Sequence, residues 1–130
     1  MAQFAHSDVL DNGIAYIKSN CNLVAIISSY SPGDSYATVT GCILAEATLT
    51  NADFTLSSAG DDRVLTTPAG KQDASANATG GSATNHIAFL DTVNSKVLWV
   101  TQETSGQVIT SGNPVKFPSL TYTAKQPVTQ

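Results

Sequence analysis

The sequence predicts a mainly β protein: a single-domain β-sandwich or barrel with one N-terminal α-helix. Short apolar segments separated by turn residues recur along most of the chain, as in sandwiches and barrels. Helical spacing occurs only near the N-terminus, so the helix is expected to cap or flank the sheets. With 130 residues and 13.5 kDa, the chain fits one domain. Folding would bury roughly two-thirds of the unfolded surface, enough for a core without a metal or a disulfide.

The predicted helix spans residues 7–19 and follows an N-terminal arm, residues 1–6. Ser7 can cap this helix, and Asp8 and Asp11 lie in its first turn, where carboxylates favour the positive end of the helix dipole. Apolar residues at three-to-four spacing form one stripe that should pack on a sheet. The stripe consists of Val9, Leu10, Ile14 and Ile17.

The predicted β core spans residues 22–123, and a polar tail, residues 124–130, follows it. Thr50 followed by Asp53 predicts a single capped helical turn between strands. Pro32-Gly33 and the segment 111–114 predict turns. The expected strands are 23–28, 38–45, 55–58, 63–67, a weak strand in the first half of 70–85, 87–90, 96–101, 107–110 and 116–123.

The segment 86–102 is expected to form the hairpin at the centre of the core. Asp91, Asn94 and Ser95 are residues whose side chains bond back to turn backbone. The run 97–100 is β-branched and aromatic, has no polar break and contains the only tryptophan, Trp99. Both faces of this strand should therefore be covered.

Composition and charge exclude several function classes. Charged residues form only 12% of the chain, and the net charge is −4. The basic residues are scattered singly, so nothing predicts a nucleic-acid partner. The longest apolar run, 23–27, is far too short to span a membrane. The first residues show no signal-peptide pattern, and we expect synthesis in a cytoplasm.

No pattern of reactive residues predicts catalysis, a cofactor or a metal. Cys21 and Cys42 fit no zinc spacing and are expected to be a buried pair of free thiols, with a disulfide between them as the alternative. His86, at the start of a core strand, is expected to be structural. Asp61-Asp62 indicates a solvated turn, and Asp91 with Glu103 indicates no acid–base pair. We therefore expect a protein that is not an enzyme.

One further pattern runs from about residue 4 to residue 123: Phe4, Asp-Val-Leu-Asp at 8–11, Ile-Ala-Tyr-Ile-Lys at 14–18, Leu-Ala at 44–45, Leu-Thr-Asn-Ala-Asp-Phe-Thr-Leu at 49–56, Arg-Val at 63–64, Thr-Asn-His-Ile-Ala-Phe-Leu-Asp at 84–91, Leu-Trp-Val-Thr at 98–101 and Ser-Gly-Asn-Pro-Val at 111–115. In this order the segments resemble a group of small virion proteins of tailed bacteriophages. These are fold-determining residues, and none is a catalytic signature.

The resemblance implies a non-enzymatic virion protein made in the host bacterial cytoplasm. Capsid decoration is the preferred role, and a neck, collar or tail-fibre component is the alternative, including a receptor- or carbohydrate-binding module. The implied partners are the major capsid protein or neck and tail proteins. Homo-oligomers are expected, and a trimer is favoured because capsids offer three-fold positions.

The two ends of the chain are the expected partner-binding segments. Phe4, Pro127 and Val128 are apolar residues among polar ones, outside the periodic elements. We expect both ends to contact other chains and not to fold back on their own core. A carbohydrate-binding role would instead require exposed aromatic side chains for stacking, and Tyr30, Tyr36 and Tyr122 are the candidates.

Overall fold

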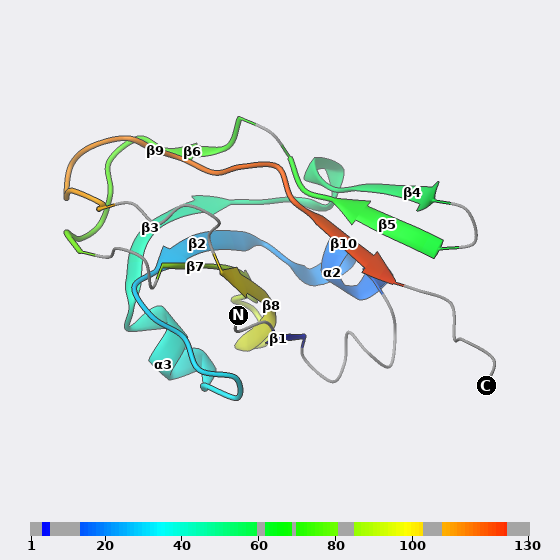
Figure 1. The fold of residues 1–130 in the computed structure, drawn as a ribbon, viewed down its shortest axis with the longest axis horizontal. Helices are drawn as coiled ribbons and strands as arrows, with labels where there is room; N and C mark the ends of the chain where they lie inside the picture. Colours follow the sequence, from blue (N-terminus) through cyan, green and yellow to red (C-terminus); the bar gives the residue numbers. More distant parts are fainter. Residues whose placement is uncertain are drawn as a thin grey trace.

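The computed structural model describes residues 4–5, 14–59, 62–68, 70–80, 85–102 and 108–124. In these ranges the protein is mainly β, with three antiparallel sheets and short helices arranged as a small sandwich-like domain (Figure 1). The predicted fold class is confirmed. No helix in the described part of the chain is long and apolar enough to cross a membrane.

The largest sheet has five strands in the order β1-β8-β7-β2-β3. All neighbouring pairs are antiparallel, and the predicted central hairpin, β7–β8, is confirmed. The strands are β1 (Phe4–Ala5), β2 (Leu23–Ile27), β3 (Ile43–Thr48), β7 (His86–Asp91) and β8 (Lys96–Gln102).

The central strands β2, β7 and β8 are buried on both faces, as predicted for the run 97–100 of β8. Alternate residues of β2 enter different apolar clusters, with Val24 on one face and Ala25 on the other. Two register shifts modify this alternation. They place Leu44-Ala45 of β3 and Leu98-Trp99 of β8 together in the larger cluster, since a bulge lets two consecutive side chains share a face.

Two short helices pack on the sheets, and one of them replaces part of a predicted strand. Helix α2 (Ile14–Asn20) contacts two strands of a second sheet, described below. It overlaps the predicted helix 7–19 and ends one residue later, and the first residues of the prediction fall outside the described ranges. Helix α3 (Tyr36–Thr40) overturns the strand expected from residue 38. Ser35 caps α3 by accepting a hydrogen bond from the Thr38 backbone N–H at 3.2 Å. This cap outweighs the strand preference of the β-branched residues in 38–40.

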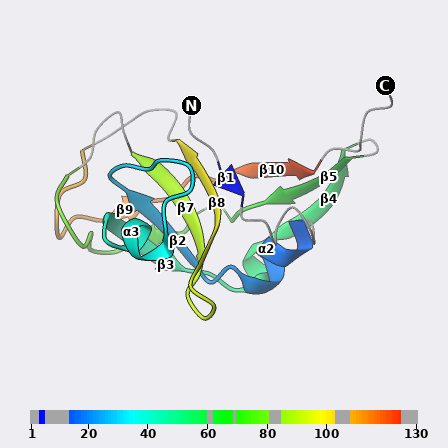
Figure 2. The ribbon, with the colours of Figure 1, turned by 90° about the horizontal axis from the view of Figure 1, so that it is seen from below.

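The second sheet has three strands in the order β10-β5-β4, with β4 (Thr55–Ala59), β5 (Asp62–Thr66) and β10 (Thr121–Ala124). Its register aligns Leu56, Leu65 and Tyr122 in one row, and all three pack in or against the larger apolar cluster. The neighbouring rows are rich in Thr and Ser. Figures 1 and 2 both place this sheet and α2 at the end of the molecule opposite α3.

The last part of the chain departs from the predicted single strand 116–123. It forms β9 (Val115–Lys116), which pairs with β6 (Gln72–Asp73), and then β10 in a different sheet. Pro118 lies between them and lacks the N–H that a continuing ladder requires. Ala124 belongs to β10, so the expected tail begins one residue later. Of the strand expected at 107–110, the structure describes a single bridge between Ile109 and Gly80.

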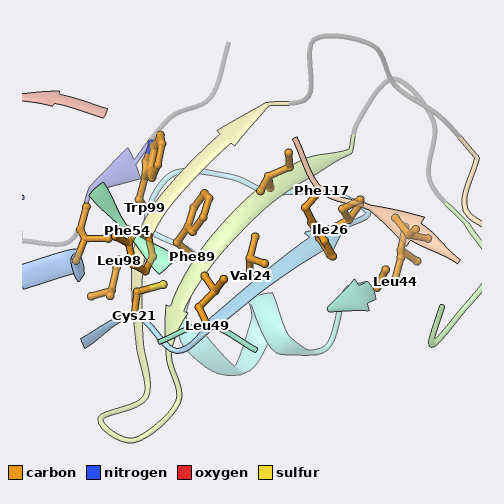
Figure 3. Packing of buried hydrophobic residues seen from close by; sticks show 14 of the residues in the cluster. Cys21, Val24, Ile26, Leu44, Leu49, Phe54, Phe89, Leu98, Trp99 and Phe117 are labelled. Carbon is orange, nitrogen blue, oxygen red and sulfur yellow. The ribbon is translucent and has the colours of Figure 1, made fainter. Parts of the chain in front are cut away.

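The larger apolar cluster joins the two main sheets and contains the tryptophan (Figure 3). Trp99 is only 6% exposed, which confirms its predicted burial. Its ring stacks on Phe89 at 4.6 Å between centroids. Tyr122 of the three-stranded sheet meets the same indole edge-on at 5.2 Å. The two sheets thus share one core.

Candidate functional site

A polar pocket of about 270 Å³ opens where α2 ends, beside the turn of the β7–β8 hairpin. We call it the asparagine pocket because amides dominate its wall. Three segments distant in sequence form it: residues 19–22, 49–51 and 91–94. Its amide and hydroxyl groups come from Ser19, Asn20, Asn22, Thr50, Asn51 and Asn94.

Backbone hydrogen bonds hold these segments together. The Asn22 N–H donates to the Leu90 carbonyl at 3.0 Å, and the Asn22 carbonyl accepts from the Leu49 N–H at 2.9 Å. Lys18 donates to the backbone carbonyls of Asn51 and Phe54 at 2.6 and 2.8 Å. The helix end and the 3₁₀ turn η1 (Asn51–Asp53) are therefore fixed relative to the sheet. The predicted capped turn at 50–53 is confirmed by the Thr50 N–H bond to the Asp53 carboxylate at 2.8 Å.

The carboxylate of Asp91 organises the hairpin turn. One oxygen accepts from the backbone N–H groups of Val93 and Asn94, at 3.0 and 3.1 Å. The other accepts from the Asn94 side chain at 2.8 Å. Asp91 is 1% exposed, so this carboxylate serves the turn. Glu103, with which it was considered as a pair, lies outside the described residues.

The hairpin turn is fixed from a second side as well. The Asn22 side chain accepts from the Thr92 N–H at 3.0 Å and donates to the Thr92 hydroxyl at 2.7 Å. Ser95 closes the turn with a φ of 55°, the left-handed region that non-glycine residues seldom adopt. Val93, at the tip, is 80% exposed. The turn is rigidly built and presents an apolar side chain to solvent.

Cys21 lines the inner wall of the pocket but is not suited to nucleophilic chemistry. Burial raises the pKa of its thiol to about 12, so the thiolate that reacts is not formed at neutral pH. Its sulfur donates to the Leu23 carbonyl at 3.6 Å. Cys21 and Cys42 are both free thiols, so the disulfide alternative is not realised. Cys42 is half-buried, not buried as the expected thiol pair would be.

The second feature that can bind a partner is the pair of outer strands of the three-stranded sheet. Within the described ranges, no strand pairs with the outer edge of β4 or of β10. Neither strand contains a charged residue or a proline, the usual protection of an exposed edge. The exposed side chains on their outward rows are Thr55, Ser57, Thr121 and Thr123.

The outer edge of β3, in the five-stranded sheet, is covered by other segments of the chain. The Glu46 N–H donates to the Asp73 carboxylate at 2.9 Å. The Leu44 carbonyl accepts from the Asn77 and Ala78 N–H groups at 2.7 and 3.2 Å. The chain itself therefore covers this edge.

The structure gives a mixed outcome for the predicted partner-binding residues. Phe4 belongs to β1, whose backbone pairs with β8 opposite Val100. The expectation that residues 1–5 do not fold back on the core is therefore wrong for Phe4 and Ala5, because β8 offers its free edge to them. Pro127 and Val128 lie outside the described residues.

Other candidate residues are placed as follows. Tyr30 is buried, and Tyr36 and Tyr122 are half-buried against the two apolar clusters, so none forms the exposed stacking platform considered for carbohydrate. His86 is buried in β7, with its ring 6.0 Å from that of Tyr30. Asp61 falls outside the described residues. Within those ranges, no three His, Cys, Asp or Glu side chains form a group that could hold a metal ion.

Comparison of the chain with protein-family models, with curated proteins and with solved structures found no match.

Proposed function

We propose that this protein is a non-enzymatic structural component of a tailed-phage particle, most specifically a capsid decoration protein. The observation that carries the proposal is the pair of uncharged strands β4 and β10, whose outer edges have no pairing strand in the described part of the chain. Such edges offer rows of backbone N–H and C=O groups to another chain. A protein that works by assembly can use them, whereas a freely diffusing monomer normally protects them.

The direction of the strands suggests how copies associate. Both β4 and β10 are antiparallel to β5, so they run in the same direction. Pairing β4 of one copy with β10 of the next would occupy both edges at once. This head-to-tail contact closes into a ring when its rotation is an exact fraction of a turn. A trimer closed in this way matches the three-fold positions of a capsid.

Surface composition and the resemblance of segments to phage virion proteins support the same role. Charged residues form 12% of the chain, and the outward side of the three-stranded sheet carries hydroxyl groups. A surface of this kind repels neighbouring protein weakly. The capsid and its neck or tail proteins are the proposed partners.

Copy number in purified particles tests the proposed location. Quantitative mass spectrometry should find the chain in hundreds of copies per particle if it decorates the capsid. A dozen or so copies would favour the neck, collar or tail-fibre alternative. Absence from washed particles would refute a structural role.

A charge placed on the open edges tests the proposed contact. The variant Ser57→Lys/Thr123→Lys should keep its melting temperature within a few degrees, because both side chains are exposed. It should shift from trimer to monomer in sedimentation and bind particles less. Thr48→Lys, an exposed position on the covered strand β3, is the matched control and should leave assembly unchanged. Unchanged assembly of the double variant would reject the edge contact.

A further inference from the structure

We propose that the asparagine pocket binds one uncharged sugar unit, such as the terminal hexose of a glycan. This inference does not depend on the location of the protein in a particle. It starts from the size of the pocket, about 270 Å³. That volume is just below the usual range for small-molecule sites, roughly 300–1,000 Å³. It suits a single ring better than an extended chain.

The chemistry of the wall matches sugar hydroxyls. Each Asn side chain offers an acceptor oxygen and two N–H donors, and each Ser or Thr hydroxyl can both donate and accept a hydrogen bond. Adjacent sugar hydroxyls likewise donate and accept. Among the described residues, the side chains of Ser19 and Asn51 make no hydrogen bond, although both line the pocket. They are available to a ligand without breaking an existing contact.

Hydrogen bonds within the protein already hold the remaining wall of the pocket in place. Asp91 holds the turn through three hydrogen bonds, and the Asn22–Thr92 pair adds two more. A rigid wall reduces the entropy lost on binding. Val93, 80% exposed beside the pocket, offers methyl groups to the C–H face of a sugar ring. No aromatic residue in the described part of the chain lines the pocket, so this site would bind a sugar through hydrogen bonds and the Val93 methyl groups and not through the aromatic stacking expected from the sequence.

Charge selects among sugars. Asp91 is the one charged residue among those that line the pocket. Its buried carboxylate disfavours an acidic sugar, since two like charges would share a partly desolvated site. A neutral hexose carries no charge and is not repelled by the Asp91 carboxylate. A peptide is the less favoured ligand, because extended peptides usually add to a strand edge and the pocket is bordered by a helix end and turns.

Titration by NMR tests the proposal on the intact protein. Glucose, galactose, mannose and N-acetylglucosamine would be added to ¹⁵N-labelled protein, with glucuronate as the acidic comparison. At least one neutral sugar should shift the amide signals of Asn20, Asn51 and Val93 with a dissociation constant on the order of 1 mM. Glucuronate should bind more weakly than glucose.

Two variants make the test specific. Asn51→Ala should weaken the best sugar about five- to tenfold, the effect of one lost hydrogen bond. Ser19→Tyr should block the pocket, since Ser19 is exposed at its wall. Asn113→Ala, an exposed asparagine outside the pocket, should bind like the parent.

Three results would overturn the proposal. The first is no shift with any neutral sugar up to about 50 mM, well above the expected dissociation constant. The second is binding that Asn51→Ala and Ser19→Tyr leave intact. The third is a shift of the same amides by an uncharged peptide and by no sugar, which would assign the pocket to a protein partner.

Discussion

The five-stranded and three-stranded sheets of this protein differ in burial and in how their edges are covered. The strands β2 and β7 are buried on both faces, and the chain covers the outer edge of β3 through Asp73, Asn77 and Ala78. Among the side chains that the structure describes, the three-stranded sheet buries one row, Leu56, Leu65 and Tyr122, at least in part. It leaves hydroxyl groups on the other rows and no described partner on the edges of β4 and β10.

Burial of apolar surface is the main favourable term in folding, so the five-stranded sheet should contribute most of the free energy of unfolding. The smaller sheet adds an apolar row to the shared core, and in the assembly that we propose its backbone edges pair with other chains. Substitutions in the five-stranded sheet should therefore reduce folding stability. Substitutions on the edges of the three-stranded sheet should instead reduce association.

The largest expected effect is that of Trp99→Ala, in the five-stranded sheet. Removing a buried indole that stacks on Phe89 should lower the free energy of unfolding by about 3–5 kcal/mol. Tyr122→Ala, which removes the edge-on partner from the smaller sheet, should cost about 1–2 kcal/mol because that ring is half-buried. Urea denaturation of both variants measures the contrast. Equal losses would mean that the two sheets contribute alike.

The next effect concerns the hairpin turn at the end of the five-stranded sheet. Asp91→Ala removes the acceptor of three hydrogen bonds and should cost about 1.5–3 kcal/mol. Asp34→Ala is the control, since that carboxylate accepts one hydrogen bond, from the Ser31 N–H, in an exposed turn. Its cost should stay below about 1 kcal/mol. Similar melting temperatures for the two variants would show that the hairpin turn is not specially fixed.

The sequence was most informative where structure is local. The hairpin β7–β8 and the capped turn at Thr50–Asp53 follow from periodicity and turn chemistry within a few residues. Helix α3 was missed because residues 38–40 are β-branched, and the cap at Ser35 decides the conformation against their preference. Pairing of Phe4 with β8 was missed because it joins Phe4 to Val100, two segments far apart in the sequence.

The candidate site could be predicted less well than the fold. The asparagine pocket needs three segments, 19–22, 49–51 and 91–94, that meet only through tertiary packing. In the sequence, Ser19-Asn20 indicates only the end of a helix, and Asn22 only the start of the β core. The open edges of β4 and β10 depend on which strands pair, and this is decided by non-local contacts. A cluster of Asn at chain segments that end helices and strands is the one sequence signal that could have indicated the pocket.

The effect expected to be smallest at neutral pH concerns Cys21, at the junction of the two sheets, because it appears only as a loss of stability at alkaline pH. Cys21 lies between α2, which contacts β5 and β10, and β2 of the larger sheet. Burial raises the pKa of its thiol from 9.0 to about 12. The unfolded chain thus loses this proton above about pH 9, while the folded protein keeps it.

It follows that the stabilising contribution of the neutral thiol is complete below pH 9 and is lost as the pH rises toward 12. The expected loss is about 1.4 kcal/mol per pH unit within that window.

Burial also raises the pKa values of Tyr30 and Tyr122, so the parent protein has alkaline sensitivity from other groups. Cys21→Ala should reduce the slope of unfolding free energy against pH, and Cys42→Ala should not. A double Cys→Ser variant should still fold and melt cooperatively, because no disulfide is lost. Identical slopes for Cys21→Ala and Cys42→Ala would show that the tyrosines cause the alkaline sensitivity and that the Cys21 thiol does not contribute to the pH dependence of the unfolding free energy.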